Sequence, residues 1–350
     1  MPYPGGRLHG DTTPFLVLLV LAFAAYLVGL WAVRRGAAFA AVFVVACAIQ
    51  LAPLAGPLFL SSDAWTYWSY ARVHDPYRDT PADDAVSARF AGRAYLHDSS
   101  PYGAVWSLAS RPAGLMGSAD AAAWSFRALA ALSVLAATWL LARRRAPAAA
   151  LVGWNPVVAL HFAGGGHNDA LMVALVAVAL ALGERERVQR AGVAWGLAVL
   201  VKWVPLLLLP LRGLEARARG RRVGHLGFAL TVAGVCALAT LLWRLHWLHA
   251  LVPLARDASR QTSYALPHRL HLPIWPFVAA YVCAYAWLAF EAVRGRARLG
   301  FAFALLLLAL PYLAAWYVLW PLALSAWDED DAATLLSLAL CAYLLPQRLL

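Results

Sequence analysis

A cluster of polar residues interrupts a part of the sequence that is otherwise apolar. His167, Asn168 and Asp169 follow three consecutive glycines, and Asn155 and His161 stand shortly before them. Such side chains are costly in hydrocarbon unless they meet partners or a water-filled cavity, so inside a membrane segment they usually mark a working site. Glycines also let a ligand approach the backbone closely. We therefore predict that this cluster lines a substrate pocket.

A single lysine, Lys202, stands in the middle of another apolar segment. In one interpretation it snorkels from a helix end to the lipid headgroups. The other, favoured by its central position, is that its ammonium faces a cavity and binds an anionic group such as a lipid-linked phosphate. Basic clusters flank residues 191–211 on both sides and Pro205 lies within them, which predicts a re-entrant hairpin.

One carboxylate follows the second apolar run directly, at the predicted membrane surface. Asp63 stands there, before Trp65, Tyr67, Trp68 and Tyr70, whose spacing predicts a helix in the membrane interface. Ser and Asp are preferred N-caps, so Asp63 could simply cap that helix. A carboxylate at the mouth of a cavity also suits a general base. Spacing alone leaves both interpretations open.

The elements that hold these residues are predicted from composition and from the apolar runs. The chain is 63% hydrophobic and 13% charged, with a mean hydropathy of +0.65, which is typical of an integral membrane protein. We predict an all-α polytopic helical bundle of about 9 to 11 membrane segments, forming a single domain over residues 1–350. Eight runs are long enough to serve as segments, at 15–33, 38–59, 121–142, 147–163, 169–183, 226–243, 273–291 and 332–346. Residues 299–326, broken by Pro311 and Pro321, fit one tilted span or two short ones.

The formal charge of +11 is explained by topology rather than by nucleic acid, since the arginines form short clusters at the ends of apolar runs, including 143–145. Residues 61–120 hold seven aspartates and are predicted to form an external loop with interfacial helices. Residues 244–272 are predicted to form a second external loop, whose basic side chains favour either a phosphate-binding surface or contact with lipid headgroups alone.

We expect a multi-pass protein of the cell membrane whose active site faces outward. No cleavable signal peptide is expected, because the run 15–33 is long enough to remain as a span.

The cysteines and histidines give no metal or disulfide signature. Cys47, Cys236, Cys283 and Cys341 lie in apolar runs without paired spacing. His167 and Asp169 are two residues apart, and no second pair has ligand spacing. We predict no metal ligands, while dependence on a divalent cation stays open.

Six segments together resemble a known family, in the order Ser-Ser-Asp-Ala-Trp-Thr-Tyr-Trp-Ser-Tyr (61–70), His-Asp-Pro-Tyr (74–77), Ser-Pro-Tyr-Gly-Ala-Val-Trp (100–106), Trp-Asn-Pro-Val-Val-Ala-Leu-His (154–161), Gly-Gly-Gly-His-Asn-Asp-Ala-Leu-Met (164–172) and Trp-Tyr-Val-Leu-Trp-Pro-Leu (316–322). This succession is similar to the bacterial polyprenol-phosphate-mannose-dependent α-1,6-mannosyltransferases, of the GT-C class of membrane glycosyltransferases. The segment Gly-Leu-Ala-Val-Leu-Val-Lys-Trp-Val-Pro (196–205) also resembles a stretch of related GT-C enzymes.

The resemblance implies an inverting transferase that moves a sugar, mannose in this family, from a polyprenyl phosphate carrier to a lipid or glycan acceptor hydroxyl at the outer face. Asp63 matches the aspartate of the first loop, the proposed general base, and Lys202 would stabilise the leaving phosphate with Arg256, Arg260 and Arg269. The implied substrate-binding residues are His167, Asn168, Asp169, Asn155, Lys202 and Tyr102, with Trp316, Tyr317 and Trp320 as a wall.

Two other classes of function are compatible with intramembrane polar residues. A transporter or flippase of a lipid-linked sugar or small anion uses broken helices and re-entrant hairpins. An inverted-repeat transporter would show two similar halves, whereas the chain has no second copy of Gly-His-Asn-Asp. A scaffold protein would leave the polar cluster without a task.

Overall fold

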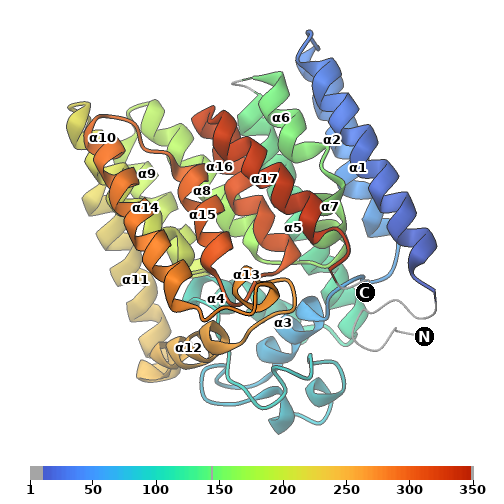
Figure 1. Cartoon of the computed structure of the whole chain (residues 1–350). Helices are drawn as coiled ribbons and strands as arrows, with labels where there is room; N and C mark the ends of the chain where they lie inside the picture. The colour runs from blue at the N-terminus through green and yellow to red at the C-terminus, as the bar shows by residue number, and fades with distance from the viewer. Residues whose placement is uncertain (1–10, 143–144, 348–350) are drawn as a thin grey trace.

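The described part of the computed structural model, residues 11–142 and 145–347, consists of helices and turns and contains no strand. Long helices stand side by side as a bundle, and several short helices gather at one end of it (Figure 1). The α-helices are α1 (Thr13–Val33), α2 (Phe39–Leu51), α3 (Asp63–Arg72), α4 (Ala104–Ser110), α5 (Ala119–Ala142), α6 (Ala146–Gly153), α7 (Pro156–Ala159), α8 (Asp169–Glu184), α9 (Val188–Val201), α10 (Leu209–Ala218), α11 (His225–Trp243), α12 (Leu251–Ser259), α13 (Leu266–Arg269), α14 (Trp275–Val293), α15 (Leu299–Ala309), α16 (Leu319–Asp328) and α17 (Asp331–Leu344). Shorter turns of helix are η2 (Ala52–Ala55), η3 (Pro81–Asp83), η4 (Ser87–Arg89), η5 (Arg111–Leu115), η6 (Leu160–Gly164), η7 (Val204–Leu208), η8 (Arg244–Ala250) and η9 (Ala315–Val318).

Several of these helices are apolar enough to cross a membrane. By length and composition, four described stretches qualify: α1, most of α5, the stretch His225–Pro253 that contains α11, and α14. The pair α6 and α7–η6 passes as a fifth span that bends by 49°. The predicted all-helical membrane protein is confirmed, while the total of about 9 to 11 segments stays a prediction, because α2, α9, α15 and α17 are shorter apolar helices.

The helix positions follow the apolar runs of the sequence closely, although two runs are broken. Residues 299–326 form two short helices, α15 and α16, because the chain leaves the helix before Pro311 and resumes it through η9. The run 147–163 bends at Asn155–Pro156, where α7 begins. Arg143 and Arg144 of the basic cluster at 143–145 lie outside the described residues.

The segment around Lys202 reverses direction. Helix α9 ends at Val201, Lys202 is extended (φ −153°, ψ 133°), and η7 and α10 lead the chain back. A β-carbon on Gly192 would lie 2.0 Å from the carbonyl oxygen of Gly224, so the residues before and after this segment pack tightly together. This course agrees with a hairpin; insertion of the hairpin into a membrane stays a prediction.

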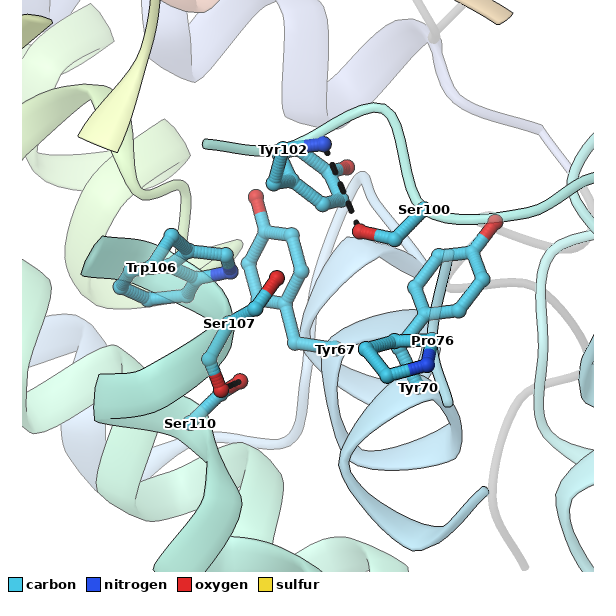
Figure 2. Close-up of a pocket in the computed structure, with 8 residues that line it drawn as sticks. All are labelled: Tyr67, Tyr70, Pro76, Ser100, Tyr102, Trp106, Ser107 and Ser110. Carbon is cyan, nitrogen blue, oxygen red and sulfur yellow. Dashed lines mark hydrogen bonds between the residues drawn. The ribbon is translucent and has the colours of Figure 1, made fainter. Parts of the chain in front are cut away.

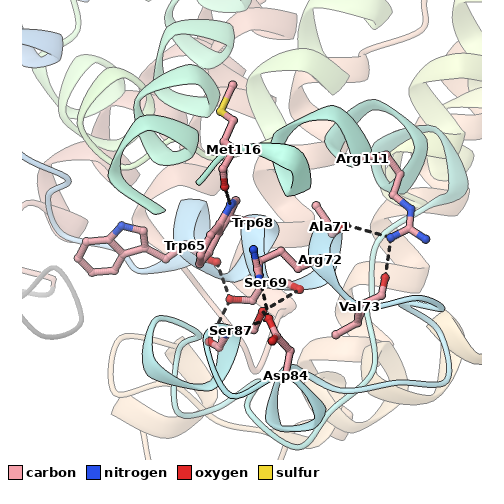
Figure 3. Close-up of polar contacts among 10 residues, drawn as sticks. All are labelled: Trp65, Trp68, Ser69, Ala71, Arg72, Val73, Asp84, Ser87, Arg111 and Met116. Carbon is pink, nitrogen blue, oxygen red and sulfur yellow. Dashed lines mark hydrogen bonds and ion pairs between the residues drawn. The ribbon is translucent and has the colours of Figure 1, made fainter. Parts of the chain in front are cut away.

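Residues 61–118 form a cap of short helices at one end of the bundle (Figure 1). Figure 3 shows how its parts are tied: Trp68 Nε1 donates to the carbonyl oxygen of Met116 at 3.3 Å, and Arg111 donates to the carbonyl oxygens of Ala71 and Val73. The guanidinium of Arg111 thus satisfies carbonyl groups at the C-terminal end of α3 that the helix itself leaves unpaired.

The aromatic side chains of α3 are buried inside the protein. Trp65, Tyr67, Trp68 and Tyr70 are each at most 4% exposed, because α5, η4 and η5 pack around the helix. The position of this helix at the membrane interface stays a prediction, but its aromatic side chains contact protein rather than lipid. Their large apolar surface stabilises the cap from within instead.

The second polar loop, residues 244–272, lies at the same end of the bundle as this cap (Figure 1). His246 Nδ1 lies 2.6 Å from Asp75 Oδ2, and Arg256 and Arg260 both pair with Asp98. These ion pairs join the two loops that were predicted to be external.

Candidate active site

The carboxylate of Asp63 reaches the polar triplet of residues 167–169. Its Oδ2 lies 3.0 Å from His167 Nδ1, although the two residues are 104 positions apart in the chain. The His167 side chain is fully buried, whereas the Asp63 side chain keeps 14% of its surface exposed. Asp63 is therefore the member of this pair that a ligand can reach.

Asp63 is the first residue of α3 rather than its cap. Ser62 occupies the N-cap position, and the backbone NH of Asp63 is held by Ser61 Oγ at 3.1 Å. The carboxylate of Asp63 contacts His167. Its place in the first turn still favours a negative charge through the helix dipole. Of the two interpretations of Asp63, the capping one does not match this geometry.

The glycines before the triplet are required by close packing. Gly166 has φ +76°, and a β-carbon there would lie 3.1 Å from Ala64 Cβ and 3.2 Å from Arg127 Cγ. A β-carbon on Gly165 would lie 2.6 Å from the carbonyl oxygen of His161. These two positions need a residue without a side chain, and the turn they make brings His167 against the start of α3.

A buried arginine holds this turn in place through hydrogen bonds to backbone carbonyl groups. Arg127 of α5 donates from Nε to the carbonyl oxygen of Ala163 at 2.7 Å and from the guanidinium to those of Gly56 and Pro53. It is only 3% exposed. Three carbonyl groups from two segments are thereby held by one side chain, which makes the approach to the triplet rigid.

The third residue of the triplet forms an ion pair with the single lysine. Lys202 Nζ lies 2.7 Å from Asp169 Oδ1, and the same oxygen accepts a hydrogen bond from Trp320 Nε1 at 2.7 Å. Asp169 is 1% exposed and Lys202 is 21% exposed. The carboxylate is thus compensated, whereas part of the Lys202 side chain remains exposed.

Aromatic rings enclose both polar pairs. Trp316 stacks on His167 with ring centroids 3.8 Å apart and planes 13° apart. Tyr317 stacks on Trp320 at 4.2 Å, and the Lys202 ammonium lies 4.7 Å from the centre of the Tyr317 ring. Such cation–π contacts hold an ammonium without consuming its hydrogen-bond donors. The aromatic residues predicted as a wall therefore do contact the triplet and Lys202.

Asn168 faces the core of the cap. Its Oδ1 lies 3.5 Å from the hydroxyl of Tyr67, which packs edge to face against Tyr102 and Trp106. Figure 2 shows Tyr67, Tyr102 and Trp106 around a gap lined further by Ser107. The gap has no room for a water molecule. Tyr102 is 9% exposed, so its predicted contact with substrate has no counterpart in this gap.

The remaining predicted residues are engaged elsewhere. Asn155 is fully buried; its side-chain oxygen caps α7 by accepting from the backbone NH groups of Val157 and Val158. The structure thus shows a structural role for Asn155, and its contact with substrate stays a prediction. Arg256 and Arg260 share Asp98, and Arg269 lies over the ring of Tyr264 at 4.7 Å. Phosphate binding by these three arginines stays a prediction.

Electrostatics within the cap stabilise its loops. The hydrogen bond from Arg72 Nε to Asp84 Oδ2, 2.8 Å long, together with the hydroxyl of Ser87, lowers the pKa of Asp84 to about 2 (Figure 3). Thr80, through its backbone NH and its hydroxyl, likewise lowers the pKa of Asp83. Both carboxylates therefore stay charged at neutral pH and hold the chain that follows α3.

Among the described residues, no group of three or more His, Cys, Asp or Glu side chains is arranged to hold a metal ion. The polar centre consists of a carboxylate with an imidazole, and a carboxylate with an ammonium.

Two residues that contribute to the site were not predicted from the sequence. Arg127 could have been noticed as a lone charge inside an apolar run, and Tyr67 was assigned to a membrane interface.

The fold and the site together define a helical membrane protein whose polar centre lies between helix ends and aromatic rings. Residues 12–218 match the family model described as alpha-(1->6)-mannopyranosyltransferase, N-terminal domain. The match covers more than half of the chain, including Asp63, the triplet and Lys202, and the chain belongs to this family of mannosyltransferases. No curated protein and no solved structure matches the chain.

Proposed function

We propose that the protein transfers a mannosyl group from a polyprenyl phosphate carrier to an acceptor hydroxyl, with inversion, at the outer face of the cell membrane. Its membership of a mannosyltransferase family makes it an enzyme that needs a sugar donor and an acceptor. The lipid carrier is inferred from the membrane helices and from Lys202, whose side chain is 21% exposed and can meet an anionic group.

The observation that carries this proposal is the contact between Asp63 and His167, at 3.0 Å, beside the aromatic wall. In the proposed step the acceptor oxygen attacks the anomeric carbon and its proton passes to the Asp63 carboxylate. The bond from the anomeric carbon to the phosphate oxygen breaks, and the carrier phosphate leaves with the electron pair. Lys202 stabilises the charge that develops on it.

The orientation of the base is provided by the imidazole. With a proton on Nδ1, His167 donates to Asp63 Oδ2 and holds the carboxylate at the edge of the buried site. His167 is itself fixed by its stack on Trp316. Because His167 is fully buried and Asp63 is not, we assign the proton transfer to Asp63 and a positioning role to His167.

The test is transfer of labelled mannose by purified protein from polyprenyl phosphate mannose to a panel of lipid and glycan acceptors. We expect Asp63→Asn to lower turnover by about 10²- to 10⁴-fold, as the loss of a general base does. Asp83→Asn, a carboxylate of the same cap that lies outside the site, serves as the matched control and should leave turnover unchanged. Full activity of Asp63→Asn would refute the assignment of the base, and transport of the donor without transfer to any acceptor would refute the proposed reaction.

A further inference from the structure

A groove of about 800 Å³ opens where the beginning of α9, the length of α10 and the beginning of α11 meet. It lies at the end of the bundle away from α3 and α4 (Figure 1). Helix α9 runs from this groove toward Lys202 over 14 residues, which is roughly 20 Å of helix. The groove is therefore separate from the proposed active site.

The walls of the groove are rigid. Gln189 of α9 accepts a hydrogen bond through Oε1 from the backbone NH of Gly227 at 2.8 Å, which locks the beginnings of α9 and α11 together. Gly220, with φ +61°, ends α10 in a left-handed turn. In that turn the backbone NH of Arg221 donates to the carbonyl oxygen of Ala216 at 2.8 Å. The groove thus results from the way the hairpin closes against α11.

The rim of the groove carries a cluster of positive charge. Five arginines lie between residues 212 and 222, and the single acid among them, Glu215, pairs with Arg212 and with Arg219. Arg217, Arg221 and Arg222 line the groove and are exposed. Within the described part of the chain they form no ion pair.

The inner lining of the groove is mainly apolar. Val188, Pro210, Leu214 and Val223 contribute to it, and a β-carbon on Gly213 would meet no atom within 4 Å. A small soluble anion has no apolar part to bury against these side chains, so the apolar lining would not contribute to its binding. An amphiphile with an anionic head would place its phosphate among the guanidinium groups and its first methylene groups against the apolar side chains.

We propose that this groove binds the headgroup and upper acyl chains of an anionic phospholipid. Basic pockets between membrane helices are suited to anionic headgroups, and the volume of the groove lies within the range of small-molecule sites. The proposal is independent of the proposed transfer reaction, because no residue of the groove belongs to the Asp63 site.

The test is a titration of the full-length protein in detergent with phosphatidylglycerol, with bound lipid counted by native mass spectrometry. The combined variant Arg217→Gln, Arg221→Gln and Arg222→Gln should lower the apparent affinity on the order of 100-fold, since each arginine near an anionic lipid surface contributes a factor of about 5. The matched control, Arg34→Gln with Arg35→Gln and Arg294→Gln, removes the same charge from exposed arginines outside the groove and should bind as the unmodified protein does.

A second variant keeps the charges and removes the space. Gly213→Trp projects a large ring into the open groove and should also weaken binding, while the elution volume and thermal midpoint stay unchanged. Equal binding of phosphatidylglycerol and phosphatidylcholine, or equal losses in the two triple variants, would overturn the proposal in favour of general attraction. Glycerol phosphate binding as tightly as the lipid would overturn it in favour of a soluble anion.

Discussion

The role of His167 can be separated from that of Asp63 by two substitutions at one position. His167→Phe keeps a ring to stack on Trp316 but removes the group that lies 3.0 Å from Asp63 Oδ2. His167→Asn keeps a side-chain amide that can donate to the carboxylate but loses the stack. If His167 acts by orienting the base, the Phe variant should be impaired and the Asn variant largely active.

The size of the effect follows from the environment of the pair. A hydrogen bond to a charged group contributes about 1.5–3 kcal/mol when it is shielded from water, and this one joins a fully buried imidazole to a carboxylate that is 14% exposed. We therefore apply this whole range of free energy to the hydrogen bond between His167 and Asp63. On this basis His167→Phe should lower kcat by about 10- to 150-fold. The apparent KM for the donor should change little, because His167 contacts Asp63 rather than Lys202.

The assay is a double-mutant cycle on initial rates of mannose transfer. In the Asp63→Asn background there is no base left to orient, so adding His167→Phe should have almost no further effect. His97→Phe, an exposed histidine of the same cap, is the control for the loss of an imidazole. The reasoning would be refuted if His167→Phe lowered the rate by the same factor in both backgrounds, because His167 would then act without Asp63.

Three further predictions follow from the contacts around the site and the cap. Lys202→Met should raise the apparent KM for the donor by about 10-fold or more, and it should lower the thermal midpoint because Asp169, 1% exposed, loses its counterion. Adding Asp169→Asn should restore the midpoint but not the KM, and unchanged donor KM in both variants would return Lys202 to a snorkelling role. Arg127→Met strands three carbonyl groups and should destabilise the protein by about 2–4 kcal/mol, measured as a thermal midpoint in detergent; an unchanged midpoint would show that the turn holds itself. Asp84→Asn should cost about 1 kcal/mol at pH 7, because its partly exposed pair with Arg72 is screened. The pKa of Asp84 is lowered to about 2, so this stabilisation is complete above the usual pKa and lost as the pH falls toward 2, and the two proteins should differ in midpoint at pH 7 but converge near pH 2.

The helical elements could be predicted from the sequence because apolar runs and prolines act locally. The eight simple runs each contain described helices, and Pro311 separates α15 from α16 as a helix-breaking residue should. The burial of the aromatic side chains of α3 could not be predicted in this way. Tyr and Trp suit a membrane interface and a protein core equally well, and only the folding of η4 and η5 over α3 decides between them.

The spacing of residues in the sequence also could not predict which site residues contact one another. Asp169, at the start of α8, and Lys202, in the extended backbone after α9, are 33 residues apart, and their contact depends on α9 ending one residue before the lysine. Asn155 is the opposite case, because a local signal was available. Asparagine followed by proline is typical of an N-cap and the first helical residue, and that is how Asn155 and Pro156 are used.

The two carboxylates of the site begin helices in the same way yet have different partners. Asp63 is the first residue of α3 and Asp169 the first of α8, so both gain from a helix dipole. Asp169 is buried, and its Oδ1 is engaged by both the Lys202 ammonium and Trp320 Nε1 at 2.7 Å. Asp63 meets an imidazole, which can hold it in place as a neutral donor, and stays partly exposed. This difference favours Asp63 as the proposed base, and in the proposed reaction Asp169 holds the Lys202 ammonium in place through their ion pair.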